Sequence, residues 1–246
     1  MKATQFEFRF RLLIGVALYV VGFWAPWNLL AGPSAAPATT AWLAIPTLVD
    51  RWGWIRLDQA SLAVTWVAIA FAFLGAALRV WGTAYLSASV VHSGAMHGER
   101  LMASGPYRFV RNPLYLGSYL VGLSIAILMP PSGAAVFVVL LAVFYVRLML
   151  GEEAFLTSRS GEAYLEYKRQ VPRLVPWRWP KIAAAPAHPE WLVSIAAELF
   201  PIGYAGCLAV LAWRYEPHVL IQCVLVSFGL SLVMRAFLPK TAATAE

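Results

Sequence analysis

Long apolar runs constrain this chain more than any other feature, because a helix needs about 20 apolar residues to cross the hydrocarbon core of a bilayer. With 61% hydrophobic and 13% charged residues, the 246-residue chain is too apolar for a soluble domain of its length. The predicted fold is therefore all-α, a multi-span membrane protein with about six transmembrane helices. The predicted spans are residues 12–30, 61–85, 114–129, 134–150, 191–213 and 219–238.

The segments between these runs divide the chain into three predicted parts. These are an N-terminal helix and loop (1–60), a core (61–182) and an additional helix pair (183–246). Residues 31–58, rich in Pro, Ala and Trp, are expected to form a loop. In the core, PPSG at 130–133 predicts a tight helical hairpin, and a separate charged helix is expected at 152–169.

The distribution of charge predicts the orientation in the membrane. The net charge is +7, and with six spans all but three of the 19 basic residues fall on one side. The exceptions are Arg51, Arg56 and Arg214. Basic loops face the cytoplasm, so both termini and a cytoplasmic cofactor pocket are expected on that side. Because the basic residues border apolar runs instead of forming one patch, membrane lipids are expected as partners and nucleic acid is not. The oligomeric state is left open.

The segment SGPYRFVRNPLYLG, at residues 104–117, is polar and basic yet leads directly into an apolar run. Asn112 is a good N-cap residue and Pro113 suits the first helical position, so a helix is expected to begin there. The positive end of its dipole, with Arg108 and Arg111 beside it, favours an anion. The alternative is a capped helix whose arginines extend to the interface.

Two adjacent carboxylates, Glu152 and Glu153, directly follow the apolar run 134–150. A helix C-terminus prefers cations, so an arginine or a cationic ligand is expected to compensate them. With a tight hairpin they would lie near Asn112, giving one site with an anion-binding side and an acidic side. S-Adenosylmethionine, with an amino-acid end and a sulfonium, would match both. The alternative is a solvated acidic start of a helix.

SGPYRFVRNPLYLG followed by GEEAFL and GEAYLEYKRQVP resembles the integral-membrane methyltransferases, which include isoprenylcysteine carboxyl methyltransferase and phospholipid N-methyltransferases. The resemblance runs from about Arg79 to Pro176, roughly 40% of the chain. It implies methyl transfer from S-adenosylmethionine, bound at the cytoplasmic side, to a lipophilic substrate that enters from the bilayer.

The resemblance also implies functional residues. The cofactor-binding residues it implies are His92, Glu99, Arg100, Leu101, Met102, Tyr107, Asn112, Pro113, Leu114, Tyr115 and Glu152. The candidate catalytic residues are Arg111, Glu152 and Glu153. The candidate substrate contacts are Arg147, Leu148 and Glu198.

Two positions depart from the family pattern. Asn112 stands where the family has histidine, and an amide can cap a helix but cannot titrate. Leu148 stands where the family has an arginine for the substrate carboxylate, and Arg147 is next to it on another helical face. The acceptor is therefore left open among a carboxylate, an amine and a thiol.

Several single residues carry weaker signals. Arg79 is expected either to pair with Glu152 or Glu153 or to extend to the interface. Glu198, inside an apolar run, is a candidate pocket residue. Tyr164 and Tyr167 are expected on the packing face of the charged helix. The histidines lack the ligand spacing of a zinc site, so no metal is expected.

Three other functions are alternatives to a methyltransferase. A sterol-type membrane reductase would need a nicotinamide site and more spans than this chain supplies. A small transporter would need polar residues facing each other at mid-membrane, whereas here they gather towards one surface. A scaffold without catalysis is the third.

Overall fold

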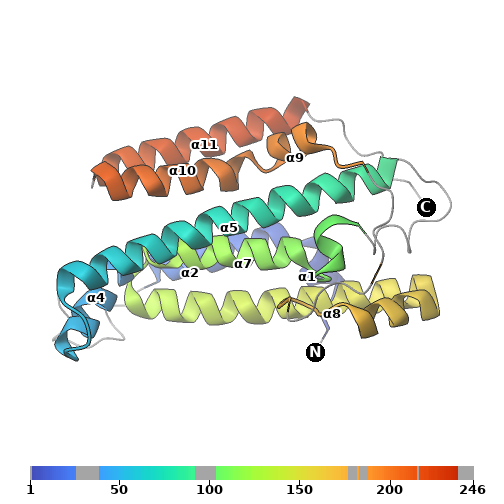
Figure 1. Cartoon of the computed structure of the whole chain (residues 1–246), viewed down its shortest axis with the longest axis horizontal. Coiled ribbons are helices and arrows are strands. Elements are labelled where there is room, and N and C mark those ends of the chain that lie inside the picture. The colour runs from blue at the N-terminus through green and yellow to red at the C-terminus, as the bar shows by residue number, and fades with distance from the viewer. Residues whose placement is uncertain are drawn as a thin grey trace. The chain divides into compact units, whose positions relative to one another are not determined.

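A computed structural model describes residues 2–25, 39–91, 104–176, 182, 188–214 and 216–237. The side chains of residues 87–91, 217 and 235 lie outside this description. Within the described segments the secondary structure is helical and contains no strand (Figure 1). This confirms the predicted all-α class.

The chain divides into two compact units that are described separately. The first unit comprises Met1–Leu74 and Ser118–Gly161, and the second comprises Gly75–Gly117 and Glu162–Glu246. The helices α5 (Leu57–Val91), α7 (Pro113–Ala126) and α8 (Pro131–Gln170) contribute residues to both units. The three-part division expected from the sequence stays a prediction.

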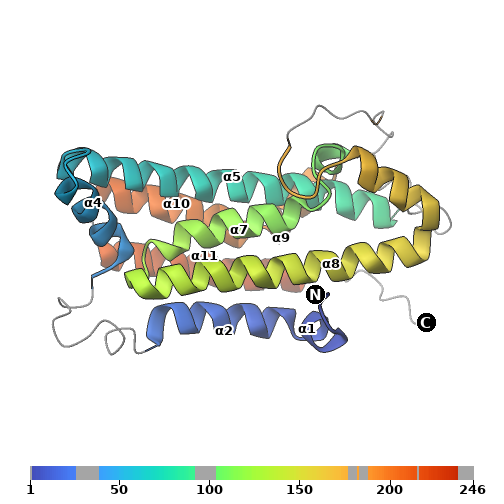
Figure 2. The ribbon, with the colours of Figure 1, turned by 90° about the horizontal axis from the view of Figure 1, so that it is seen from below.

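The core of the first unit lies where α2 (Arg11–Trp24) meets the hairpin of α7 and α8 (Figure 2). Met129, Phe137 and Leu141 are almost fully buried there. A Cβ on Gly22 would lie 2.6 Å from the Met129 sulfur, and one on Gly122 would lie 2.5 Å from a Leu141 methyl. Gly22 therefore allows α2 to approach Met129 in the turn before α8, and Gly122 allows α7 to approach α8 closely.

The predicted hairpin is confirmed, because α7 ends at Ala126 and α8 begins at Pro131. The start of α4 (Ala41–Arg51) docks on this turn, where the Ala41 amide donates to the Met129 carbonyl at 2.8 Å. The expectation of a loop throughout 31–58 was therefore wrong. Tertiary contacts favour the helix despite an internal proline: Pro46 is buried, and the Trp42 indole donates to the Thr65 hydroxyl at 2.8 Å.

The expectation of a separate charged helix at 152–169 was also wrong, because these residues belong to α8. It runs without a break past Glu152 and is interrupted only at Gly161, whose backbone (φ 56°, ψ −130°) is open to glycine and not to other residues. Glu152 and Glu153 therefore lie inside a helix. The argument that they oppose the dipole of a helix C-terminus does not hold.

In the second unit, α10 (Leu199–Arg214) packs along α11 (Pro217–Phe237), with Gly203 in close contact with Ser227. The run 191–213, predicted as one span, is two helices. α9 (Trp191–Ala197) and α10 are bent by 66° at a break beside Glu198.

Among the residues that the structure describes, two helices are long and apolar enough to cross a bilayer: Leu57–Leu86 and Pro131–Gln170. A third is added if α9 and α10 together form one span. The remaining predicted spans overlap, within the described residues, with the shorter apolar helices α2, α7 and α11. A multi-helix apolar protein is thus observed, while six spans and a cytoplasmic pocket stay predictions.

Candidate functional site

The segment 104–117 forms a compact, largely buried entry to α7. It begins with the short 3-10 helix η1 (Gly105–Arg108) and leads through buried Val110 and Asn112 to Pro113. As predicted, α7 starts at Pro113, where a missing N–H costs no intrahelical hydrogen bond. The Asn112 carbonyl accepts the Leu116 amide at 3.1 Å, as expected of the residue that precedes a first turn.

Residues that follow α8 hold this segment through its backbone. The Arg111 amide donates to the Pro172 carbonyl at 2.9 Å, and the Asn112 amide donates to the Arg173 carbonyl at 3.2 Å. The Asn112 side-chain amide reaches the same Arg173 oxygen at 3.4 Å. Asn112 thus fixes the chain that passes beside the start of α7.

Arginine side chains of the 104–117 segment add further hydrogen bonds to backbone carbonyls. Arg111 donates from Nη1 to the Lys168 carbonyl at 3.0 Å. Arg108 donates from Nε and Nη2 to the Ile182 carbonyl at 3.0 and 2.9 Å. The two arginines thus hold backbone carbonyls at and beyond the end of α8, and the expected positive charge beside α7 stays a prediction. The sequence carried no signal for these carbonyl partners.

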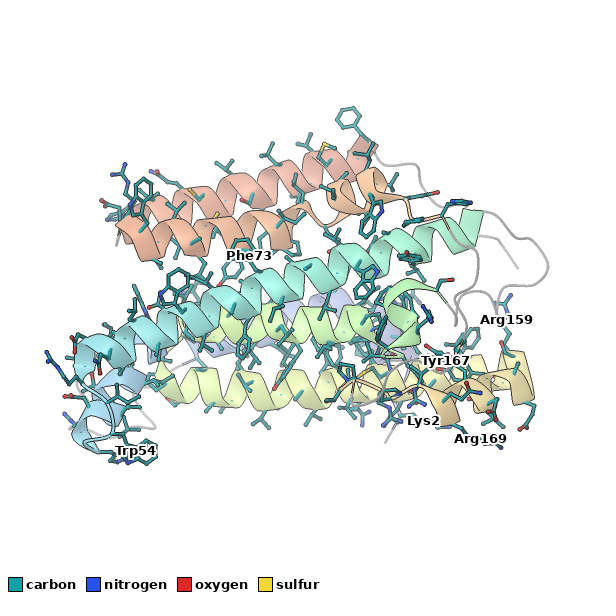
Figure 3. The ribbon with its side chains drawn as sticks, in the orientation of Figure 1. Lys2, Trp54, Phe73, Arg159, Tyr167 and Arg169 are labelled. Carbon is teal, nitrogen blue, oxygen red and sulfur yellow. The ribbon has the colours of Figure 1, made fainter. Side chains whose placement is uncertain are left out.

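The last turns of α8 pack as predicted. Tyr164 and Tyr167 are 3% and 6% exposed and are buried with Val171. The Tyr167 hydroxyl donates to the Tyr107 carbonyl at 2.7 Å. Tyr167 and Arg169 point to different sides of this helical segment (Figure 3).

Arg79 has a partner that the sequence did not suggest. Its Nε and Nη2 atoms donate to the two carboxylate oxygens of Glu198 at 2.6 and 2.9 Å. The hydroxyl of Thr83 donates to the same carboxylate at 2.8 Å. Glu198 was predicted as a substrate contact; that role is untested, and the structure gives it a role in joining α9 to α5.

The predicted substrate residues of the first unit have different surroundings. Arg147 makes a bidentate ion pair with Glu7 of α1 (Gln5–Arg9), with both N–O distances 2.8 Å. Leu148 is 2% exposed. The two residues therefore lie on different faces, as expected. Hydrogen bonds from Arg147 and the Thr4 amide lower the pKa of Glu7 from 4.5 to about 2.

The candidate catalytic carboxylates also belong to the first unit. Glu153 is 3% exposed and Glu152 is half-buried. Tyr107, Arg111 and Asn112 belong to the second unit, so a joint site with the carboxylates stays a prediction from the sequence. Five further predicted cofactor residues lie outside the described residues: His92, Glu99, Arg100, Leu101 and Met102.

The phospholipid methyltransferase family matches residues 63–162 of this chain. This region is therefore similar to the integral-membrane methyltransferases. The match includes the start of α7 and both glutamates, Glu152 and Glu153. The resemblance recognised from the sequence is confirmed, and the apolar helices agree with an integral membrane protein.

A curated relative supports the same superfamily. Over 152 residues the chain is 27% identical to methanethiol S-methyltransferase 1 of Bradyrhizobium diazoefficiens. The alignment covers 56% of this chain and 48% of that protein, so the chain spans about half the length of this relative. No solved structure matches the chain.

Proposed function

We propose that this protein is an S-adenosylmethionine-dependent membrane methyltransferase that acts on a lipophilic acceptor. The main support is that the family match covers the start of α7 and the glutamate pair of α8, in which Glu153 is buried and Glu152 is half-buried. These are the residues in which the sequence predicts a site for a ligand with both an anionic and a cationic end.

The chemistry of these residues fits the cofactor. A carboxylate suits the positive end of the α7 dipole, where Asn112 precedes the helix and Tyr115 lies in its first turn, and Arg111 would add positive charge to this site. An ammonium and a sulfonium suit Glu152 and Glu153, because a buried carboxylate is stable when a cation or hydrogen bonds compensate it. The pairing of the two groups of residues rests on the sequence resemblance.

When bound, S-adenosylmethionine supplies a methyl group on a sulfonium, and the sulfur leaves as a neutral thioether. The protein is then required for positioning and electrostatics more than for proton transfer. The backbone links to Tyr107, Arg111 and Asn112 keep their segment in one conformation. Glu152 and Glu153 supply negative charge to hold the cationic end. A carboxylate or thiolate acceptor would need no general base. An amine would have to be neutral when it attacks, and a neutral thiol would have to release its proton as its sulfur is methylated.

A small thiol is a second candidate acceptor. The curated relative is named for methanethiol, a neutral thiol. Leu148, where the resemblance implies an arginine for a substrate carboxylate, is a buried leucine, and the neighbouring Arg147 is paired with Glu7. Both observations favour an acceptor without a carboxylate.

The first experiment measures cofactor binding. Glu152→Gln removes one negative charge from the proposed cation site, so S-adenosylmethionine affinity should fall by at least tenfold, equivalent to about 1.4 kcal/mol. Isothermal titration calorimetry on the purified chain in lipid nanodiscs measures this. Glu162→Gln is the matched control, since Glu162 lies on the same helix but is exposed and pairs with Arg169. Equal affinity in the wild type and Glu152→Gln would remove the assignment.

A second experiment identifies the acceptor. The protein is incubated with methyl-labelled S-adenosylmethionine and either a total lipid extract or methanethiol. Label in a lipid product supports the first candidate, and label in a volatile thioether supports the second. Absence of cofactor binding, with solute transport in vesicles, would contradict the methyltransferase proposal.

A further inference from the structure

The helix α9 meets α5 through polar contacts at every fourth residue. The Glu190 amide, just before α9, donates to the Ala84 carbonyl at 3.1 Å. The Ser194 hydroxyl donates to the Val80 carbonyl. Glu198, at the end of α9, binds α5 through its carboxylate. Residues four apart share one helical face, so one face of α9 is hydrogen-bonded along α5.

The ion pair at Glu198 is the strongest of these contacts. Arg79 binds both carboxylate oxygens, and Thr83 adds a third hydrogen bond. The side chains of Glu198 and Arg79 are 6% and 24% exposed. Removing one member of such a pair leaves a buried charge without its partner, which is strongly destabilising for that contact. The pair therefore fixes α9 against α5.

The same arginine touches the last residue of the 104–117 segment. A Cβ on Gly117 would lie 2.8 Å from Arg79 Cγ and 2.8 Å from the Gly75 carbonyl oxygen. A larger residue would therefore displace the Arg79 side chain from its path to Glu198. A side chain at position 117 would therefore disturb the ion pair between Arg79 and Glu198.

The N-terminal end of the 104–117 segment is also linked to α9 through one side chain. Gly105 has a φ of +50°, and a Cβ there would overlap the ring of Tyr85. Tyr85 in turn packs edge-on against Trp191, the first residue of α9, with ring centroids 6.4 Å apart. Both ends of the segment are thus one side chain away from α9.

We propose that α9 is a positioning element for methyl transfer, with Arg79 and Glu198 as positioning residues that act through the 104–117 segment. The helix lies outside the family-matched residues 63–162, so it would be an addition to the common core. The proposal rests on the function proposed above. A shift of α9 would be transmitted to the start of α7 through Arg79 and Tyr85.

The test uses the full chain in nanodiscs and compares Glu198→Gln with Trp191→Ala. Each removes one of the two connections. Both should raise amide hydrogen exchange in residues 104–117 and lower kcat roughly ten- to a hundredfold, because small displacements of aligned groups have effects of this size. The KM of the acceptor should change less than kcat. Arg79→Lys keeps the charge but not the bidentate geometry, and should lie between the wild type and Glu198→Gln.

Asp58→Asn is the matched control, because it breaks an exposed ion pair with Arg56 at the start of α5. It should leave exchange in 104–117 and kcat unchanged. Circular dichroism establishes that each variant folds; if Glu198→Gln fails to fold, Trp191→Ala and Arg79→Lys carry the test. Wild-type exchange in both folded variants, or raised exchange with wild-type kcat, would overturn the proposal. Lack of cofactor binding by the wild type would contradict the proposed function, while the exchange data would still report on the coupling.

Discussion

Glycines in this chain have different roles according to their surroundings. Gly105 combines a positive φ with a neighbouring aromatic ring, whereas beyond its own stretch of helix α10 no atom lies within 4 Å of the position that a Cβ would take on Gly206. Gly105→Ala should therefore lower the free energy of unfolding by about 1–3 kcal/mol, from backbone strain and overlap with Tyr85. Gly206→Ala should be neutral or stabilising by up to about 1 kcal/mol, because alanine is the better helix former.

Reversible unfolding of both variants in mild detergent measures this difference. A Gly105→Ala protein as stable as the Gly206→Ala protein would contradict the described close contact. The two substitutions add the same methyl group, so the comparison isolates the local geometry of each position.

Glu7 gives a second residue-level prediction, which concerns pH. Its pKa falls from 4.5 to about 2 because Arg147 and Thr4 donate hydrogen bonds to the carboxylate. A lowered pKa means that the pair stabilises docking fully above pH 4.5 and loses this contribution as the pH falls through 2. Between neutral pH and about pH 4, α1 should therefore stay docked on α8.

Hydrogen exchange of residues 3–9, corrected for the intrinsic pH dependence of exchange, measures this docking. Glu7→Gln should show faster exchange at neutral pH, since the bidentate ion pair is lost. If α1 is released near pH 4.5 in the wild type, the hydrogen bonds to Glu7 do not lower its pKa as described.

Some helix boundaries are specified by neighbouring residues in the sequence, and others depend on tertiary contacts. The start of α7 was predictable, because Asn112 and Pro113 specify a helix N-terminus within two residues. The helix α4 was not, because packing of Trp42 and Pro46 decides it. The bend beside Glu198 was also missed: a hydropathy pattern does not show that a carboxylate at that position pairs with Arg79, 119 residues away.

The candidate site was likewise predictable from the sequence only where neighbouring residues specify it. The residue types and the order of the motifs indicated the superfamily, since both lie in continuous stretches of sequence. The carbonyl partners of Arg108 and Arg111 were not predictable, because a backbone carbonyl has no signature in sequence. The pairing of Glu7 with Arg147 joins the first helix to α8 and depends on folding alone.

For the whole molecule, the number of membrane crossings decides on which sides the termini lie. Six spans would place both termini on the cytoplasmic side, in agreement with the bias of basic residues. If α9 and α10 form a re-entrant pair in place of one span, an odd number of crossings remains and the termini lie on opposite sides. The bent pair is thus one element on which the topology depends.

Reporter fusions test this topology directly. A cytoplasmic reporter such as a fluorescent protein should be active at both ends of the chain, and a reporter inserted at Gly53, in the exposed turn between α4 and α5, should be inactive. A cytoplasmic signal at the N-terminus alone would mean that α9 and α10 enter and leave the same side. Glu198 would then lie at the tip of a re-entrant pair, and the Arg79 ion pair would stabilise that tip within the bilayer.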